Sequence, residues 1–193
     1  PVDFLVPGVL AISVVATGLV AVAIQTAFER KYAVLKRLGG TPLTRGAFLV
    51  AKGLSVAALL VVQTVLVLLV AFLGLGWGPD GGILAAGLLV LLGAMTSTAL
   101  GLLLAGTLRA EATLAASNAL FLVLLVVSGV TFEAAALPGP VAAVGGLLPM
   151  GALREGLAVA LSGGGLAVRE ALVITVWGLV AVAIGRRTFR WEP

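Results

Sequence analysis

The chain has 193 residues, of which 61% are hydrophobic and 10% are charged, and its mean hydropathy is +1.24. Soluble domains average about 45–50% apolar and about 25% charged residues, so this composition indicates a membrane protein. The sequence contains no cysteine and no histidine, which excludes thiol nucleophiles, disulfides, imidazole bases and nearly all zinc, haem and iron–sulfur sites.

Five apolar runs are long enough to cross a bilayer, whose core of about 30 Å takes roughly 20 residues of helix. They predict an all-α polytopic membrane protein that forms one domain over residues 1–193. The last run is short, so its helix must begin near Leu166 and keep Arg169 and Glu170 at the membrane interface. The predicted spans are residues 4–28, 47–75, 82–107, 112–132 and 166–185.

The connection between the first two predicted spans has the pattern of a short amphipathic helix over about residues 28–40. Helical spacing gives this segment an apolar face, formed by Phe28, Tyr32, Leu35 and Leu38. Gly39 and Gly40 end the helix, and Thr41 followed by Pro42 resembles the capped start of the next one. The alternative is a basic loop that only orients the protein and touches anionic lipid, which explains the charges but not this pattern.

A further uncharged stretch, residues 134–153, is not expected to span the membrane because prolines and glycines interrupt it. Its prolines are Pro138, Pro140 and Pro149. We expect a re-entrant external segment over about residues 137–163, with short helices at about 139–148 and 150–161 joined at Pro149. Non-helical backbone at membrane depth requires surrounding protein or a watery cavity, so this segment should pack on the spans or line a vestibule.

The basic residues are distributed unevenly between the two sides of the predicted membrane domain. Ten of the twelve lie on one side, namely Arg30, Lys31, Lys36, Arg37, Arg45, Lys52, Arg109, Arg186, Arg187 and Arg190. The positive-inside rule makes that side cytoplasmic and places the start of the first span and residues 137–165 outside. This distribution is a topology signal and not the solvated basic face that nucleic acid requires. Five spans with an external amino end predict one more span upstream of Pro1.

Several short motifs together resemble the permease subunit of ABC-2 type exporters, the bacterial membrane subunits that pair with a separate ATPase. They are DFLVPG from Asp3, FER from Phe28, LKRL from Leu35, TPLT from Thr41, LPM from Leu148 and LRE from Leu153. The resemblance covers nearly the whole chain. Because members of that family have six spans, it implies that the family's first span is absent here, and it implies a location in the bacterial inner membrane.

The resemblance also implies that residues 28–40 form the coupling helix, which docks in a groove of the partner ATPase. The implied docking and coupling residues are Glu29, Arg30, Lys31, Tyr32, Leu35, Arg37, Leu38, Thr41 and Pro42. The implied partners are an ABC ATPase, which holds ATP and Mg²⁺, a second membrane subunit, expected to be a second copy of this chain, and membrane lipid. This chain itself is expected to bind no cofactor or metal and to catalyse no reaction. The cargo is expected to be an amphipathic drug or antibiotic, a lipid or a lipid-linked glycan, moved out of the cell.

Polar residues within the predicted spans are sparse and uncharged. An ion-coupled carrier needs an ionisable group at membrane depth, and none lies between the interfaces of the first four predicted spans. Seven polar residues are candidates for lining a transport pathway, namely Gln63, Thr64, Thr96, Ser97, Thr98, Ser117 and Asn118. The alternative role for them is interhelical hydrogen bonding, worth about 0.6 kcal/mol for each bond.

Two other functions stay open at this point. An ATP-independent channel or carrier subunit needs no partner ATPase. An intramembrane enzyme needs a catalytic dyad or a metal at depth, for which this chain offers only serines, threonines and a few interfacial carboxylates. The stretch LSGGG from Leu161 is similar to the signature loop of ABC ATPases, but the sequence has no Gly-x-x-x-x-Gly-Lys-Ser/Thr loop to hold a nucleotide. We therefore predict an ordinary turn there.

Overall fold

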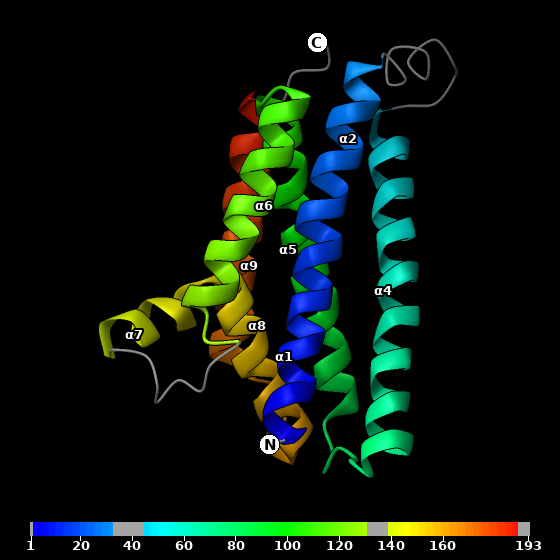
Figure 1. Ribbon diagram of the computed structural model, residues 1–193, viewed down its shortest axis with the longest axis vertical. Helices are drawn as coiled ribbons and strands as arrows, with labels where there is room; N and C mark the ends of the chain where they lie inside the picture. Colours follow the sequence, from blue (N-terminus) through cyan, green and yellow to red (C-terminus); the bar gives the residue numbers. More distant parts are fainter. Residues whose placement is uncertain (1, 33–44, 131–138, 189–193) are drawn as a thin grey trace.

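The computed structural model describes residues 2–32, 45–130 and 139–188 (Figure 1). Five helices in these ranges are long and apolar enough to cross a membrane. The first span is one continuous helix, Val2–Lys31, made of α1 (Val2–Val15), the π-helical segment η1 (Ala16–Ala21) and α2 (Val22–Lys31). The other four are α4 (Arg45–Leu75), α5 (Ile83–Thr107), α6 (Ala110–Val127) and α9 (Val168–Thr188). All regular elements in the described ranges are helical, so the predicted all-α membrane protein with five spans is confirmed.

Three spans end at residues other than the predicted ones, and α9 is one of them, since it continues to Thr188 beyond its predicted end at residue 185. The first span continues to Lys31, beyond its predicted end at residue 28. Helix α6 ends at Val127, although the uncharged run that predicted it extends to residue 132. Gly129 follows the helix with a φ of 65°, and this left-handed conformation, which glycine adopts without strain, ends a helix regardless of how apolar the next residues are.

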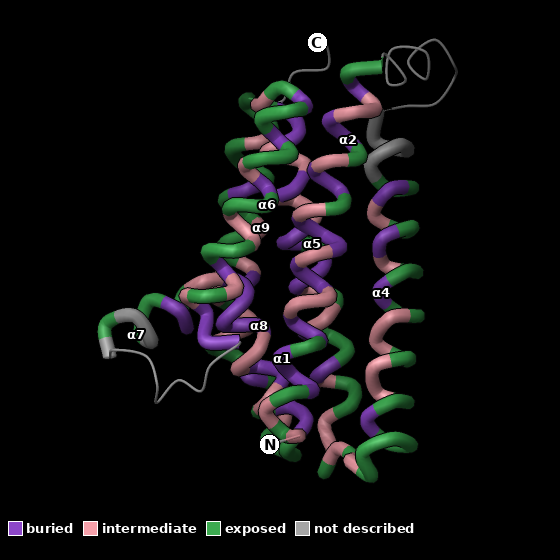
Figure 2. The backbone as a smooth tube through the Cα atoms, in the orientation of Figure 1, coloured by how far each residue is buried: buried purple, intermediate pink, exposed green. Residues whose placement is uncertain are grey.

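The first span lies in the middle of the bundle and packs closely on α5. A Cβ atom on Gly18 would lie 2.6 Å from the Cβ atom of Ser97, and a Cβ atom on Gly101 would lie 2.7 Å from the carbonyl oxygen of Gly18. Small residues at these positions let the two backbones approach, which is the main source of helix association in lipid. Figure 2 shows buried residues gathered along the first span, α5 and α8, with exposed residues along the outer faces of α4, α6 and α9.

The segment predicted to be external contains two short helices, α7 (Gly139–Leu147) and α8 (Pro149–Val159), followed by the π-helical turn η3 (Ala160–Gly164). Leu148 separates α7 from α8 with an extended backbone (φ −84°, ψ 149°), and Pro149 is the first residue of α8, where a missing N–H has no cost. Helix α8 packs against the first span, α5 and α9, and its Leu153 and Leu157 are fully buried. Helix α7 projects to the side of the bundle (Figure 1).

The described charges separate toward the two ends of the bundle. We call one end the basic end, defined by Arg30, Lys31, Lys52, Arg109, Arg186 and Arg187. The end of α2, the start of α4 and the end of α9 all lie at this end of the bundle, whereas α1 begins at the opposite end (Figure 1). At that opposite end the Trp77 Nε1 donates a hydrogen bond to Asp3 Oδ1 at 2.6 Å, which joins α1 to the chain after α4.

The stretch LSGGG also lies at the opposite end. It forms most of η3 and the residue after it, and there the chain turns toward α9. Gly163 and Gly165 both have left-handed φ angles, 81° and 75°. The backbone N–H of Asp80 donates a hydrogen bond to the carbonyl oxygen of Leu161 at 3.0 Å, so this turn packs against the connection between α4 and α5.

Candidate coupling site

The candidate site begins where the first span ends. Phe28 to Lys31 form the last turn of α2, and Tyr32 follows as its exposed C-terminal residue. The remaining predicted coupling residues lie outside the described part of the chain, namely Leu35, Arg37, Leu38, Thr41 and Pro42. The described part of the predicted coupling segment is therefore a direct continuation of the first span.

Arg30 is buried at the basic end, with 7% of its surface exposed. Its Nη1 donates a hydrogen bond to the carbonyl oxygen of Gly106 at 3.1 Å, and its Nη2 donates to the carbonyl oxygen of Leu108. Both carbonyls belong to the end of α5, where a helix leaves its last C=O groups without internal partners and carries a partial negative charge. The guanidinium of Arg30 therefore caps α5 and fixes the end of the first span to it.

Glu29 and Lys52 form an ion pair between α2 and α4. The Nζ of Lys52 lies 2.6 Å from Oε2 of Glu29, and the two side chains are 7% and 22% exposed, respectively. Removing one partner of a buried pair leaves an uncompensated charge, which is strongly destabilising. This contact therefore holds the start of α4 against the first span.

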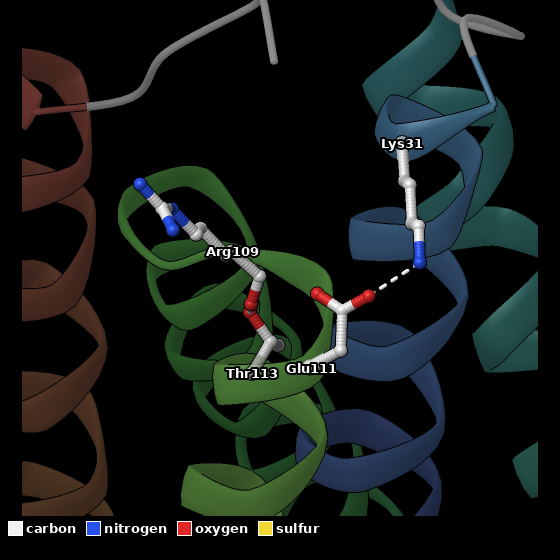
Figure 3. A network of polar contacts seen from close by, with 4 residues as sticks. All are labelled: Lys31, Arg109, Glu111 and Thr113. Carbon is white, nitrogen blue, oxygen red and sulfur yellow. Dashed lines mark hydrogen bonds and ion pairs between the residues drawn. The ribbon is translucent and has the colours of Figure 1, made fainter.

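Lys31 forms a third contact, with Glu111 in the first turn of α6 (Figure 3). Both side chains are exposed, and Glu111 also has a favourable position because the start of a helix carries a partial positive charge. Figure 3 shows the side chain of Arg109 directed away from this pair. The Thr113 hydroxyl donates to the carbonyl oxygen of Arg109 at 3.0 Å and so stabilises the first turn of α6.

Three consecutive residues of the first span thus contact three different helices: Glu29 contacts α4, Arg30 contacts α5, and Lys31 contacts α6. We call residues 29–31 the junction. The sequence singled out these residues, but not Lys52 or Glu111 as their partners. In the sequence, Lys52 and Glu111 are recognisable only as charged residues near the ends of the predicted spans that follow, which does not identify them as partners of Glu29 and Lys31.

A cavity of about 330 Å³ lies between the first span and α4, next to the junction. Thr17, Gln25 and Ser55 line it together with Glu29 and Lys52. Farther along the same interface the hydroxyl of Thr17 donates to Oε1 of Gln63 at 3.2 Å. Gln63, a predicted pathway residue, therefore makes an interhelical hydrogen bond beside this cavity.

The other predicted pathway residues do not form one group. Thr96 donates its hydroxyl to the carbonyl oxygen of Ile174 at 2.9 Å and joins α5 to α9, while Ser97 is buried. Ser117 and Asn118 both donate to the carbonyl oxygen of Leu114 on their own helix, at 3.3 Å and 2.9 Å. Thr64 is half-buried on α4. Thr98 lines a second, larger cavity between α4, α5 and α9.

The sequence matches a family model described as ABC-2 type transporter over residues 2–161. The chain belongs to this family. No curated protein and no solved structure matches the chain. The match includes the first four spans and helices α7 and α8, and it ends within η3. The protein is therefore a multi-pass ABC-2 permease, the membrane component of a transporter and not an enzyme itself, and its family implies association with an ABC ATPase.

The bend of the ABC-2 permease at Pro149 is held from both sides. The Nε1 of Trp177 on α9 donates to the carbonyl oxygen of Leu147 at 2.8 Å, just before the bend. Beyond the bend, a Cβ atom on Gly151 would lie 2.1 Å from the carbonyl oxygen of Gly145, so α7 and α8 meet where only glycine fits. Of the other predicted bend residues, Pro140 is exposed in the first turn of α7 and Pro138 lies outside the described residues.

Arg154 of α8 lies over the ring of Phe4, with its Cζ 4.9 Å from the ring centroid. This cation–π contact adds a link between α8 of the permease and the first span. Among residues 2–32, 45–130 and 139–188, no group of three or more histidine, cysteine, aspartate or glutamate side chains is placed to hold a metal ion.

Proposed function

We propose that this ABC-2 permease is the transmembrane subunit of an ATP-driven exporter and that the junction transmits movement of the ATPase to the spans. The supporting observation is that Glu29, Arg30 and Lys31 contact three helices at once. Packed helices have discrete alternative arrangements, so a displacement at one shared point biases all three together. In this proposal the basic end is cytoplasmic and faces the ATPase.

The segment that follows the junction, residues 33–44, is proposed to be the part that docks in the ATPase. The ATPase holds ATP and Mg²⁺, and the working unit contains a second copy of this chain. Because Glu29, Arg30 and Lys31 have partners within the permease, their proposed role is to pass the movement on, while the docking contacts belong to Tyr32 and the residues beyond it. The proposed cargo is an amphipathic drug or antibiotic, a lipid or a lipid-linked glycan.

The test is purification of the tagged protein from its native membrane, identification of copurifying proteins and reconstitution of the complex into liposomes. We expect an ABC ATPase to copurify, and we expect a fluorescent amphiphile or labelled lipid to move toward the external face only with ATP. A non-hydrolysable ATP analogue is the matched control. Cargo movement at the same rate without ATP, or purification without any ATPase, would instead support an ATP-independent channel or carrier.

A further inference from the structure

A second cavity of the permease, about 780 Å³, is unrelated to the junction and lies between α4, α5 and α9. Its volume falls within the range of about 300–1,000 Å³ that is typical of small-molecule sites. Apart from Thr98 and Arg186, all residues that line it are apolar or glycine. An apolar cavity of this size is suited to a hydrocarbon chain.

The cavity extends along the membrane normal in the half of the bundle next to the basic end. Its lining residues on α5 lie between positions 91 and 103, which corresponds to about 18 Å of helix at 1.5 Å per residue. One leaflet of a bilayer core is about 15 Å thick, so this length matches one layer of acyl chains. On α4 and α9 the lining residues likewise lie toward the helix ends at the basic end.

Two glycines on facing helices account for part of the cavity volume, because they have no side chains to occupy it. Gly53 on α4 and Gly185 on α9 both line the cavity, and a Cβ atom on either would have no other atom within 4 Å. The groove is thus open at positions where a side chain would fill it without a clash.

Arg186 lies at the basic end of this cavity and is exposed. Within the described part of the chain it makes no hydrogen bond or ion pair. A guanidinium in this place, at the membrane surface and above an apolar groove, complements a phosphate attached to an acyl chain.

We propose that this groove, lined by residues of α4, α5 and α9, binds one anionic phospholipid from the leaflet at the basic end. One acyl chain lies in the groove along α5, and the phosphate pairs with Arg186. The lipid fills the space between these three spans, so its occupancy supports their packing.

The test uses the purified transporter with its partner ATPase, titrated with phosphatidylglycerol or phosphatidylcholine of identical acyl chains. Native mass spectrometry then counts the lipids retained by each permease. We expect one tightly held phosphatidylglycerol and a preference for it of about fivefold over phosphatidylcholine, which corresponds to about 1 kcal/mol for one basic residue at a membrane surface.

Two pairs of variants test separately the contribution of the apolar groove and that of the Arg186 charge to lipid binding. The double change Gly53→Leu with Gly185→Leu should lower binding of both lipids at least tenfold, whereas Gly87→Leu, at an exposed and open glycine outside the groove, should leave it unchanged. Arg186→Gln should remove the preference for phosphatidylglycerol, and Arg187→Gln, at the exposed neighbouring residue, should retain it. Retention of the lipid by the double leucine variant, or equal effects of the two arginine changes, would overturn the proposal.

A second measurement on the unaltered protein does not depend on the folding of a variant. Phosphatidylglycerol with a photoreactive diazirine on its acyl chain should crosslink to peptides that contain residues 91–103. Crosslinks confined to helices other than α4, α5 and α9 would overturn the proposal.

Discussion

Reversal of the charge at Glu29 is the perturbation that most directly tests the junction. In Glu29→Lys the new ammonium faces Lys52, whose side chain is 7% exposed, and the attraction of the pair becomes repulsion. Breaking a fully buried pair costs about 3–5 kcal/mol, whereas an exposed pair contributes about 0–1 kcal/mol. Because the Glu29 side chain is 22% exposed, the pair lies between these limits, and we expect Glu29→Lys to lower the free energy of unfolding by about 2–3 kcal/mol.

The double charge swap Glu29→Lys with Lys52→Glu separates the two possible roles of Glu29. If Glu29 acts through Lys52, the swap restores both the thermal unfolding midpoint in detergent and the ATP hydrolysis stimulated by cargo. If Glu29 instead docks directly on the ATPase, the swap restores the midpoint but not the stimulated hydrolysis. A charge reversal at the exposed Asp80, at the opposite end of the bundle, is the matched control. A double variant no better than Glu29→Lys in either measurement would refute the reasoning.

Three further predictions concern other contacts. Arg30→Met should lower the free energy of unfolding by about 2–3 kcal/mol, since two charge-assisted hydrogen bonds to α5 are lost, and Arg30→Lys should restore part of this stability. Equal thermal stability of Arg30→Met and the unaltered protein would contradict the role of Arg30 as a cap of α5. Gly151→Ala should reduce the yield of folded protein in size-exclusion chromatography more than Pro149→Ala does, because its added methyl group would clash with the backbone of Gly145, whereas the first residue of a helix tolerates alanine. A larger loss of folded protein in Pro149→Ala would contradict this account of the bend. Because the chain has no cysteine, Gly78→Cys should react with an impermeant thiol reagent added outside intact cells and Thr188→Cys should not, and labelling of Thr188→Cys would reverse the proposed orientation.

The apolar runs predicted the number of spans because the bilayer imposes a minimum helix length on any sequence. The prolines placed the break between α7 and α8, where Pro149 starts α8 after an extended Leu148. The count of apolar residues, by contrast, has a limit at α6. It misplaced the end of α6, because Gly129 ends that helix through its backbone conformation, a local property that a count of apolar residues does not include.

The contacts of the junction were beyond prediction from the sequence. Arg30 contacts carbonyl groups more than 70 positions away in the chain, and nothing in a linear pattern of charges states which helix ends meet in space. The candidate pathway residues illustrate the same difficulty, since Thr96 and Asn118 look alike as isolated polar residues in apolar helices. The first bonds across to α9, whereas the second bonds to its own helix and is exposed.

The π-helical segment η1 sets the rotational phase of the first span. Each residue of an α-helix advances the side chains by about 100°, so a wider turn within a helix offsets the contact face of everything that follows it. The half before η1 packs mainly on α4, α5 and α8, and the half after it packs mainly on α5 and α6, with the Glu29–Lys52 pair reaching α4. The two halves of this long helix share one axis but turn their contact faces in different directions around it. The direction of the Arg30 side chain therefore depends on the turn at Ala16–Ala21 as much as on the place of Arg30 in the sequence. Conversion of that turn to regular α-helix with the same number of residues would rotate α2 by about 100° and turn Arg30 away from the end of α5.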